Sequence, residues 1–129
     1  MERTAIELLL SVWTENNVKS RLHIVHVADA ESLEIIQASK VAGANVTCET
    51  TPHNLHFVDT DVPDKSTVHK CKPPIRGEED RGQLWKALVE DEILDMIASD
   101  HAPYAPEDKF IEEGDFMKGK SHEYDIFTL

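Results

Sequence analysis

An acid and an imidazole stand side by side near the carboxyl end of the sequence, at Asp100 and His101. The preceding residues 97–99 are small or apolar, and Pro103 stops the segment. A carboxylate at the end of a buried strand is costly unless a metal, a hydrogen-bond donor or a substrate proton receives it. Asp100 is therefore the first candidate for chemistry. The alternative interpretation is that Asp100 caps a turn and His101 is a surface histidine.

A second candidate is His26, which lies near the end of the apolar, β-branched run of residues 22–27. Imidazole and carboxylate are both good ligands for zinc, and zinc makes a bound water nucleophilic near neutral pH. An aspartate at such a centre can also carry the proton from water to a leaving nitrogen. Catalytic zinc generally takes three protein ligands, and no HxH or HExxH pattern supplies a third. The alternative for His26 is a buried histidine that is hydrogen-bonded to neighbouring backbone.

The elements that would position these side chains alternate between helical and strand patterns. Apolar spacing predicts helices around residues 5–13, 33–41 and 84–89, and strands over residues 22–27, 45–50 and 94–99. Asp29 is placed to cap the second helix, and Gly43 is placed to end it. The proline-rich residues 51–76 are predicted to form a long loop with at most short structure.

This alternation predicts parallel strands joined by right-handed crossovers, a parallel α/β fold. Ligands of such folds meet the carboxyl ends of the strands, where His26, Glu49, His53 and Asp100 fall. Within the first strand, alternation puts His23 and His26 on opposite faces, and His26 lies nearer the carboxyl end.

Composition limits the function classes. The chain has 129 residues, enough for one domain but too few for a closed eight-stranded α/β barrel of about 250. Its net charge of −12 argues against nucleic acid and anionic membrane as partners, and no apolar run approaches the ~20 residues of a membrane span.

The acidic N-terminus does not resemble a signal peptide, so we expect a cytoplasmic protein. Cys48 and Cys71 lack CxxC spacing and are expected to be reduced and buried.

Four motifs together resemble the cyclic amidohydrolases, the group of allantoinases and dihydroorotases. They occur in order with near-family spacing: RLHIVHV (21–27), CETTPH (48–53), KCKPPIR (70–76) and IASDHAP (97–103). The KCKPPIR form and the helix after it are closer to the allantoinase branch. Tyr104 stands where dihydroorotases commonly have a histidine, which also favours that branch.

The resemblance implies a (β/α)8 barrel with a binuclear zinc centre and hydrolysis of a cyclic ureide, allantoin to allantoate. By the same resemblance, His26 and Asp100 are metal ligands, Asp100 is also the catalytic general base and acid, and Cys71-Lys72-Pro73 is the substrate-binding loop. His53 and His101 are expected beside the ligands without binding metal.

The resemblance covers only the family's strands six to eight, within residues 1–114, and residues 115–129 depart from it as a divergent tail. The other metal ligands of the family would lie before residue 1. We therefore expect a piece of a larger barrel that is inactive alone and whose open sheet edges favour self-association; family members are often homo-tetramers. Two alternatives stay open: dihydroorotase or hydantoinase specificity, and a non-catalytic α/β module that acts as an interaction surface.

Overall fold

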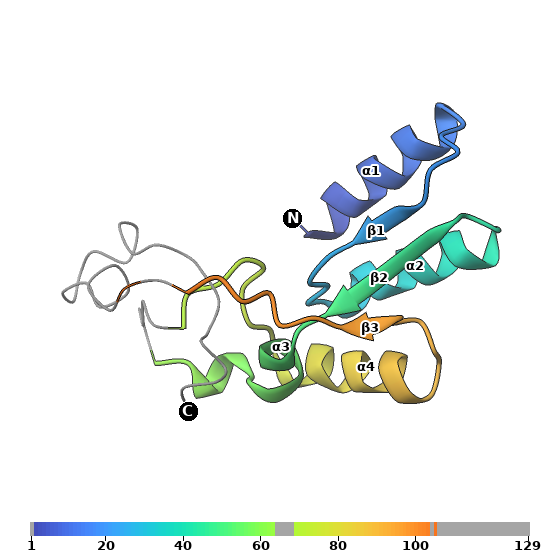
Figure 1. Cartoon of the computed structure of the whole chain (residues 1–129). Coiled ribbons are helices and arrows are strands. Elements are labelled where there is room, and N and C mark those ends of the chain that lie inside the picture. Colours follow the sequence, from blue (N-terminus) through green and yellow to red (C-terminus); the bar gives the residue numbers. More distant parts are fainter. Residues whose placement is uncertain (1, 64–68, 104, 106–129) are drawn as a thin grey trace.

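The computed structural model describes residues 2–63, 69–103 and 105. Its elements, in chain order, are α1 (Glu2–Glu15), β1 (Leu22–Ile24), α2 (Ala30–Val41), β2 (Val46–Thr50), α3 (Pro52–His56), the 3-10 helix η1 (Asp59–Asp61), α4 (Glu78–Val89) and β3 (Met96–Ile97) (Figure 1). The predicted alternation of helices and strands is confirmed. The boundary at residue 114 and the tail 115–129 lie outside the described residues.

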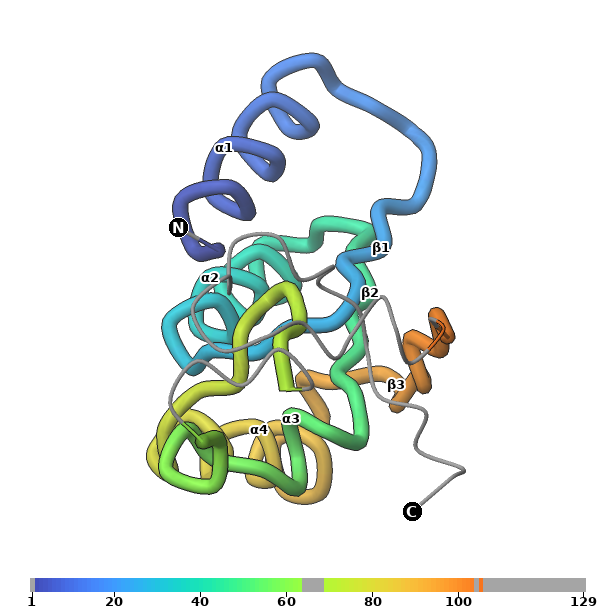
Figure 2. The backbone as a smooth tube through the Cα atoms, turned by 90° about the vertical axis from the view of Figure 1, so that its left-hand side faces the viewer, coloured from blue at the N-terminus to red at the C-terminus, as the bar shows by residue number. Residues whose placement is uncertain are grey.

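The strands form one parallel sheet in the order β1-β2-β3. Leu22 of β1 pairs with Val46, and Glu49 of β2 pairs with Met96. The helices α1, α2 and α4 lie on one side of this sheet (Figure 2). The predicted fold class, three parallel strands with flanking helices, is therefore confirmed for the part of the chain that the structure describes.

Burial in β2 explains why the helices cover one face only. Val46, Cys48 and Thr50 are buried, whereas Thr47 and Glu49, which alternate with them, are half-buried. A strand points successive side chains to opposite faces, so the apolar set faces the helices. The core cluster consists of Ile6, Leu10, Ile24, Val27, Leu33, Ile36, Val46, Cys48, Leu55, Leu84, Ala87, Ile93 and Leu94. Burying one large aliphatic side chain of this kind contributes about 1.5–3 kcal/mol.

Local signals end the helices where the sequence predicts. Asp29 caps α2, because its Oδ1 accepts a hydrogen bond of 2.7 Å from Ser32 N. Gly43 follows the helix with a φ of 85°, a conformation that a side chain disfavours. Trp85 of α4 is 46% exposed, and its Nε1–H donates a hydrogen bond to Leu55 O.

The strands β1 and β3 are shorter than predicted. The backbone of His26 has a φ of 42° and that of Asp100 a φ of 50°, so the extended conformation cannot continue through either residue. Hydrogen bonds to β2 nevertheless continue past both strands, from Val27 N to Glu49 O (2.8 Å) and from Ala98 N to Thr50 O (3.0 Å). Both segments therefore stay aligned with β2 as they leave the sheet.

A polar network fixes the beginning of β3. Asp95 Oδ2 accepts hydrogen bonds of 2.7 Å from both Lys40 Nζ and Cys48 N, and Lys40 Nζ also donates to Ile93 O (2.6 Å). Burial alone would raise the pKa of Asp95, but these two donors and the charge of Lys40 hold it below its ordinary value. The network joins α2, β2 and the entry of β3, and so sets the register of the strand that leads to Asp100.

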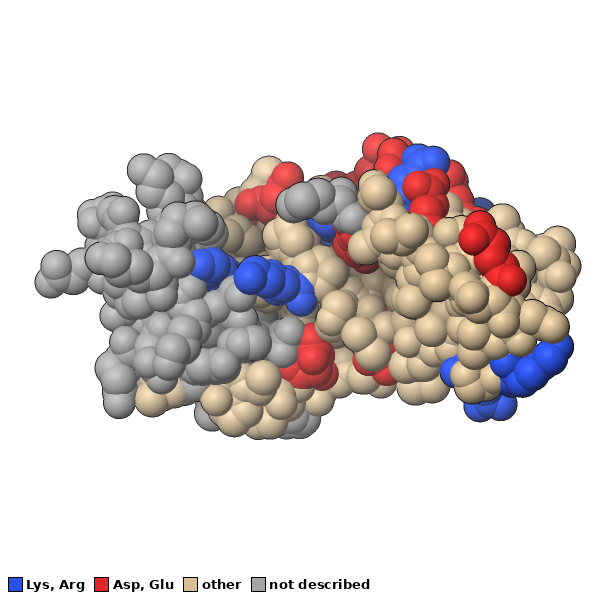
Figure 3. Space-filling model, turned by 90° about the horizontal axis from the view of Figure 1, so that it is seen from above, with Lys and Arg blue, Asp and Glu red and all other residues tan. Residues whose placement is uncertain are grey.

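On the described part of the face seen in Figure 3, charged side chains form small separate patches among residues that are neither acidic nor basic. The apolar side chains Leu8, Leu9 and Val12 of α1 are exposed. No helix among the described residues is long and apolar enough to cross a membrane.

Candidate active site at the carboxyl ends of the strands

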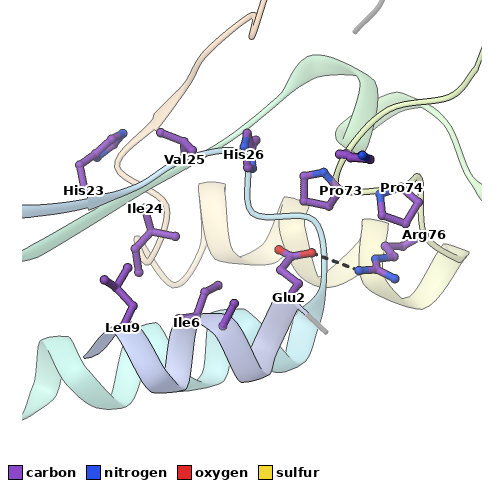
Figure 4. A pocket seen from close by; sticks show the side chains of 12 residues that line it. Glu2, Ile6, Leu9, His23, Ile24, Val25, His26, Pro73, Pro74 and Arg76 are labelled. Carbon is purple, nitrogen blue, oxygen red and sulfur yellow. Dashed lines mark hydrogen bonds and ion pairs between the residues drawn. The ribbon is translucent and has the colours of Figure 1, made fainter. Parts of the chain in front are cut away.

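A cavity of about 640 Å³ lies between α1 and β1, which is an edge strand of the sheet that the structure describes (Figure 4). It is lined by Glu2, Ala5, Ile6, Leu9, His23, Ile24, Val25, His26, Lys72, Pro73, Pro74 and Arg76. Ile24 points toward α1, whereas His26 points away from that helix, toward the side of Pro73 (Figure 4). The walls are largely apolar, and charged groups gather at the end where β1 leaves the sheet.

His26, Lys72 and Pro73, three of the residues predicted to form the site, line this one cavity. Lys72 is exposed and Pro73 half-buried, and the peptide bond between them is cis. Cys71 is buried and is not among the lining residues. The loop predicted to bind substrate thus lies beside the end of the strand that carries His26, although the two segments are far apart in sequence.

Asp100 follows β3 at the same end of the sheet, but it does not line the cavity. Its Oδ2 atom is buried, and no described residue donates a hydrogen bond to it. A buried carboxylate oxygen without a donor is costly unless a cation or another group receives it. This oxygen is the local observation that fits Asp100 as a metal ligand.

The remaining predicted residues take different positions. His53 is buried in the first turn of α3, directly after β2, where Thr51 caps the helix by accepting from Asn54 N. His101 is exposed, and its backbone N donates to Ser99 Oγ at 3.3 Å. Tyr104 lies outside the described residues.

The described residues contain no group of three or more His, Cys, Asp or Glu side chains that could hold a metal ion. His26 and Asp100 are the donor types that zinc accepts, but they make two ligand positions, and a catalytic zinc takes three from protein. The described part of the chain therefore supplies some of the ligands of a zinc site but not a complete set.

An ion cluster that sequence reasoning missed lies at the polar end of the cavity. Arg76 Nη2 is 3.2 Å from Glu2 Oε2 and 3.5 Å from Asp29 Oδ2, and the Glu2–Arg76 pair is drawn in Figure 4. These partners of Arg76 are 74 and 47 residues away in sequence. No local pattern marks Glu2, because its role depends on the packing of α1 beside β1.

Burial and charge shift the pKa values of this cluster in opposite directions. Burial raises the pKa of Glu2 to about 7, with a further contribution from the charge of Asp29, against hydrogen bonds from Ala28 N and Arg76. For Asp29, burial also acts to raise the pKa, but hydrogen bonds from Ser32 and Glu2 and the charge of Arg76 lower it overall. Glu2 therefore titrates near neutral pH, whereas Asp29 is ionised there.

A second polar group lies on the sheet face opposite the helices. His23 Nδ1 is 2.9 Å from Thr47 Oγ1, and His23 Nε2 is 3.0 Å from Glu49 Oε2. Sequence reasoning assigned His23 to the face away from His26 but gave it no partner. The cross-strand spacing of His23 and Thr47, which pair in the β1–β2 register, is the signal that predicts such a contact.

Similar proteins were found by sequence, although no family model matches the chain. The chain is 43% identical over 118 residues to "Allantoinase, mitochondrial" of Aquarana catesbeiana and 46% identical over 123 residues to the allantoinase of Arabidopsis thaliana. These alignments cover 92% and 91% of this chain and 24% of each relative. A dihydroorotase of Ligilactobacillus salivarius (strain UCC118) is 44% identical over 87 residues, which are 67% of this chain and 20% of that protein.

Solved structures agree with the sequence relatives. A D-hydantoinase from Bacillus sp. AR9 superposes with a TM-score of 0.83 at 29% identity, over 94% of this chain and 26% of its own. An L-hydantoinase (dihydropyrimidinase) from Arthrobacter aurescens gives a TM-score of 0.76 at 31% identity, over 83% and 23% of the two chains.

The chain is therefore homologous to one segment of the cyclic amidohydrolases, and its three parallel strands correspond to part of the barrel of those proteins. Within the family, allantoinases match it over more than nine-tenths of its length. The chain spans 24% of the length of those curated relatives, so the comparison concerns a segment of them.

Proposed function

We propose that this chain is a portion of an allantoinase and that the complete barrel hydrolyses the cyclic amide of allantoin to give allantoate. The observation that carries the proposal is the 42–46% identity to allantoinases over 91–92% of the chain. The positions of Lys72 and Pro73 beside His26 support it, because a substrate loop must lie against the metal-binding end of the strands.

In this proposal, His26 and Asp100 each hold zinc in a binuclear centre whose other ligands come from the rest of the barrel. Zinc would supply a water that is acidic enough to attack an amide carbonyl near neutral pH. Asp100 would take up a proton at its carboxylate and pass it to the departing ring nitrogen. The buried Oδ2 of Asp100 supports this assignment, since this acceptor oxygen has no donor among the described residues and can take up a proton or a cation.

The loop of residues 71–73 would bind the substrate. Cys71 is buried, whereas Lys72 and Pro73 line the cavity. A small cyclic ureide presents amide N–H and C=O groups in one plane, so backbone groups of this loop are suitable partners for it. His53 and His101 would support the ligands without binding metal, His53 from its buried position after β2.

A chimera tests the proposal. The 118 aligned residues of this chain would replace the matching segment of the frog allantoinase, and the product would be assayed on allantoin, dihydroorotate and hydantoin. We expect ring-opening of allantoin and at most weak turnover of the other two. The 129-residue chain alone should be inactive on all three; turnover by the isolated chain would contradict the proposal that it needs the rest of a barrel.

Dihydroorotase or hydantoinase specificity is the second candidate, supported by relatives of both kinds that match most of the chain. A chimera that opens dihydroorotate or hydantoin faster than allantoin would favour it. A folded chimera without activity on any substrate would favour the non-catalytic module. Cytoplasmic location and homo-tetrameric assembly stay predictions, and the frog relative is named as mitochondrial. Fractionation of the source cells and sedimentation of the chimera measure them.

A further inference from the structure

The loop that is predicted to bind substrate ends at Arg76, and the guanidinium of Arg76 contacts carboxylates from two other elements. We propose that Glu2, Asp29 and Arg76 form a positioning clamp that holds the loop of residues 71–76 against the segment that follows His26. The effect of this clamp on catalysis rests on the proposed function, whereas the clamp itself is a property of the folded chain and is tested without an activity assay.

Each member of the clamp holds a different piece of backbone. Glu2 Oε1 accepts a hydrogen bond of 2.8 Å from Ala28 N, two residues after His26. Asp29 Oδ1 accepts from Ser32 N at 2.7 Å in the first turn of α2. The guanidinium of Arg76 bridges the remaining oxygens of the two carboxylates. The end of the loop is thereby fixed to α1 and to the connection between β1 and α2.

The backbone of Arg76 adds a further attachment. Arg76 O accepts a hydrogen bond of 2.8 Å from Asp59 N at the start of η1. This bond ties the backbone of Arg76 to η1, while its side chain is tied to the two carboxylates. A displacement of Arg76 would change the direction in which Lys72 and Pro73 approach the cavity.

The chemistry of the cluster requires arginine. A guanidinium is planar and presents several N–H donors, so one side chain can serve two carboxylates, which a single ammonium group does less well. The side chains of Glu2, Asp29 and Arg76 are 11%, 16% and 31% exposed, so solvent screens them less than an ordinary surface pair. At a pH above the Glu2 pKa of about 7, removing the positive charge leaves two partly buried carboxylates facing each other, which favours opening of the loop.

Cys71 provides a probe for this opening. It is buried within the loop, and Cys48 is buried in the centre of the sheet, so the chain carries one thiol at the proposed moving part and one at a fixed part. A thiol reagent modifies a buried cysteine only when local or global opening exposes it. Selective labelling of Cys71 therefore measures release of the loop, and labelling of both thiols measures unfolding.

The test uses the 129-residue chain and an aromatic disulfide reagent, with the modified cysteine identified by peptide mass spectrometry. We expect Arg76→Gln to accelerate labelling of Cys71 at least tenfold while labelling of Cys48 stays slow. Arg76→Lys should give an intermediate rate. Arg3→Gln is the matched control, because it removes an arginine whose ion pairs to Glu7 and Glu31 lie on the surface, and it should leave both rates unchanged.

An unchanged Cys71 rate in Arg76→Gln would overturn the clamp. If Arg76→Gln accelerates both thiols equally, the decision passes to Glu2→Gln, with labelling above the Glu2 pKa of about 7; there the substitution removes one charge and keeps an acceptor for Ala28 N. Selective acceleration of Cys71 in Glu2→Gln supports the clamp, and equal rates in Glu2→Gln and the parent chain overturn it. Neither result depends on allantoin hydrolysis, so failure of the clamp leaves the proposed function standing, and failure of the function leaves the clamp standing.

Discussion

His26 and Asp100 share a left-handed backbone conformation, with φ angles of 42° and 50°, at the points where the chain leaves β1 and β3. Aspartate and histidine are enriched in this region relative to other residues with a side chain, but it still disfavours them. Asn17 and Glu92, which also have positive φ, lie in turns after α1 and α4. At His26 and Asp100 the conformation instead turns two potential ligands out of strand alternation, at the same end of the sheet, as functional sites often require.

The shared conformation predicts a stability difference between two substitutions at Asp100. Asparagine tolerates the left-handed region and valine does not, so Asp100→Val should lower the free energy of unfolding by about 1–2 kcal/mol more than Asp100→Asn. Urea denaturation of the 129-residue chain measures this difference. His26→Val and His26→Asn should show the same order, and equal stability within each pair would mean that neither backbone is held in this conformation.

The Lys40–Asp95 network should be worth more than a surface ion pair. Lys40→Met removes one donor to Asp95 and to Ile93 O, and Asp95→Asn weakens the acceptor for Cys48 N. We expect each change to cost about 1–3 kcal/mol, with a coupling near 1 kcal/mol in the double-mutant cycle. Lys86→Met is the matched control, because its ion pair with Asp91 is more exposed and should cost no more than about 0.5 kcal/mol. Equal losses at Lys40 and Lys86 would contradict a structural role for the network.

Stability should fall as the pH rises toward neutrality because of Glu2. Its pKa is about 7 in the folded chain and 4.5 ordinarily, so the folded state binds the proton more tightly. The resulting stabilisation is complete below pH about 4.5 and is lost as the pH rises through about 7; it is on the order of 2 kcal/mol after allowance for partial exposure. The lowered pKa values of Asp29 and Asp95 act in the opposite sense, since their contribution is present above pH about 4 and lost in acid.

Glu2→Gln isolates this effect, because histidines and other groups that titrate in the same range remain in both proteins. The difference in unfolding free energy between the parent chain and Glu2→Gln should change between pH 4.5 and about 7 and be flat below that range. A difference that is constant across the whole range would show that Glu2 titrates at its ordinary pKa.

Much of this fold can be predicted from the sequence because it depends on local patterns. The cap at Asp29, the stop at Gly43 and the alternation in β2 each follow from residue type and short spacing. The ends of β1 and β3 could not be predicted in this way. The left-handed conformation that ends the extended segments occurs at His26 and Asp100, and neither residue type requires that conformation.

The candidate site also has a part that the sequence predicts and a part that it does not. The positions of His26 and Asp100 at strand ends could be predicted from the order of helices and strands. The association of Arg76 with Glu2 could not, since it depends on how α1 packs beside β1 across 74 residues of sequence. Trp85 shows a further limit: the helical pattern of residues 84–89 does not reveal that its side chain is 46% exposed and bonded to Leu55 O.

The most direct measurement is the zinc content and allantoin hydrolysis of the frog-allantoinase chimera with His26→Ala or Asp100→Ala. Each substitution should lower bound zinc and reduce kcat at least a thousandfold, because a lost ligand disrupts a binuclear centre and Asp100 also moves the proton. His56→Ala, a change at an exposed histidine of α3, is the control and should keep the parent's zinc and rate. Full zinc content and activity in both the His26 and Asp100 variants would contradict the assignment of these two residues as the metal ligands.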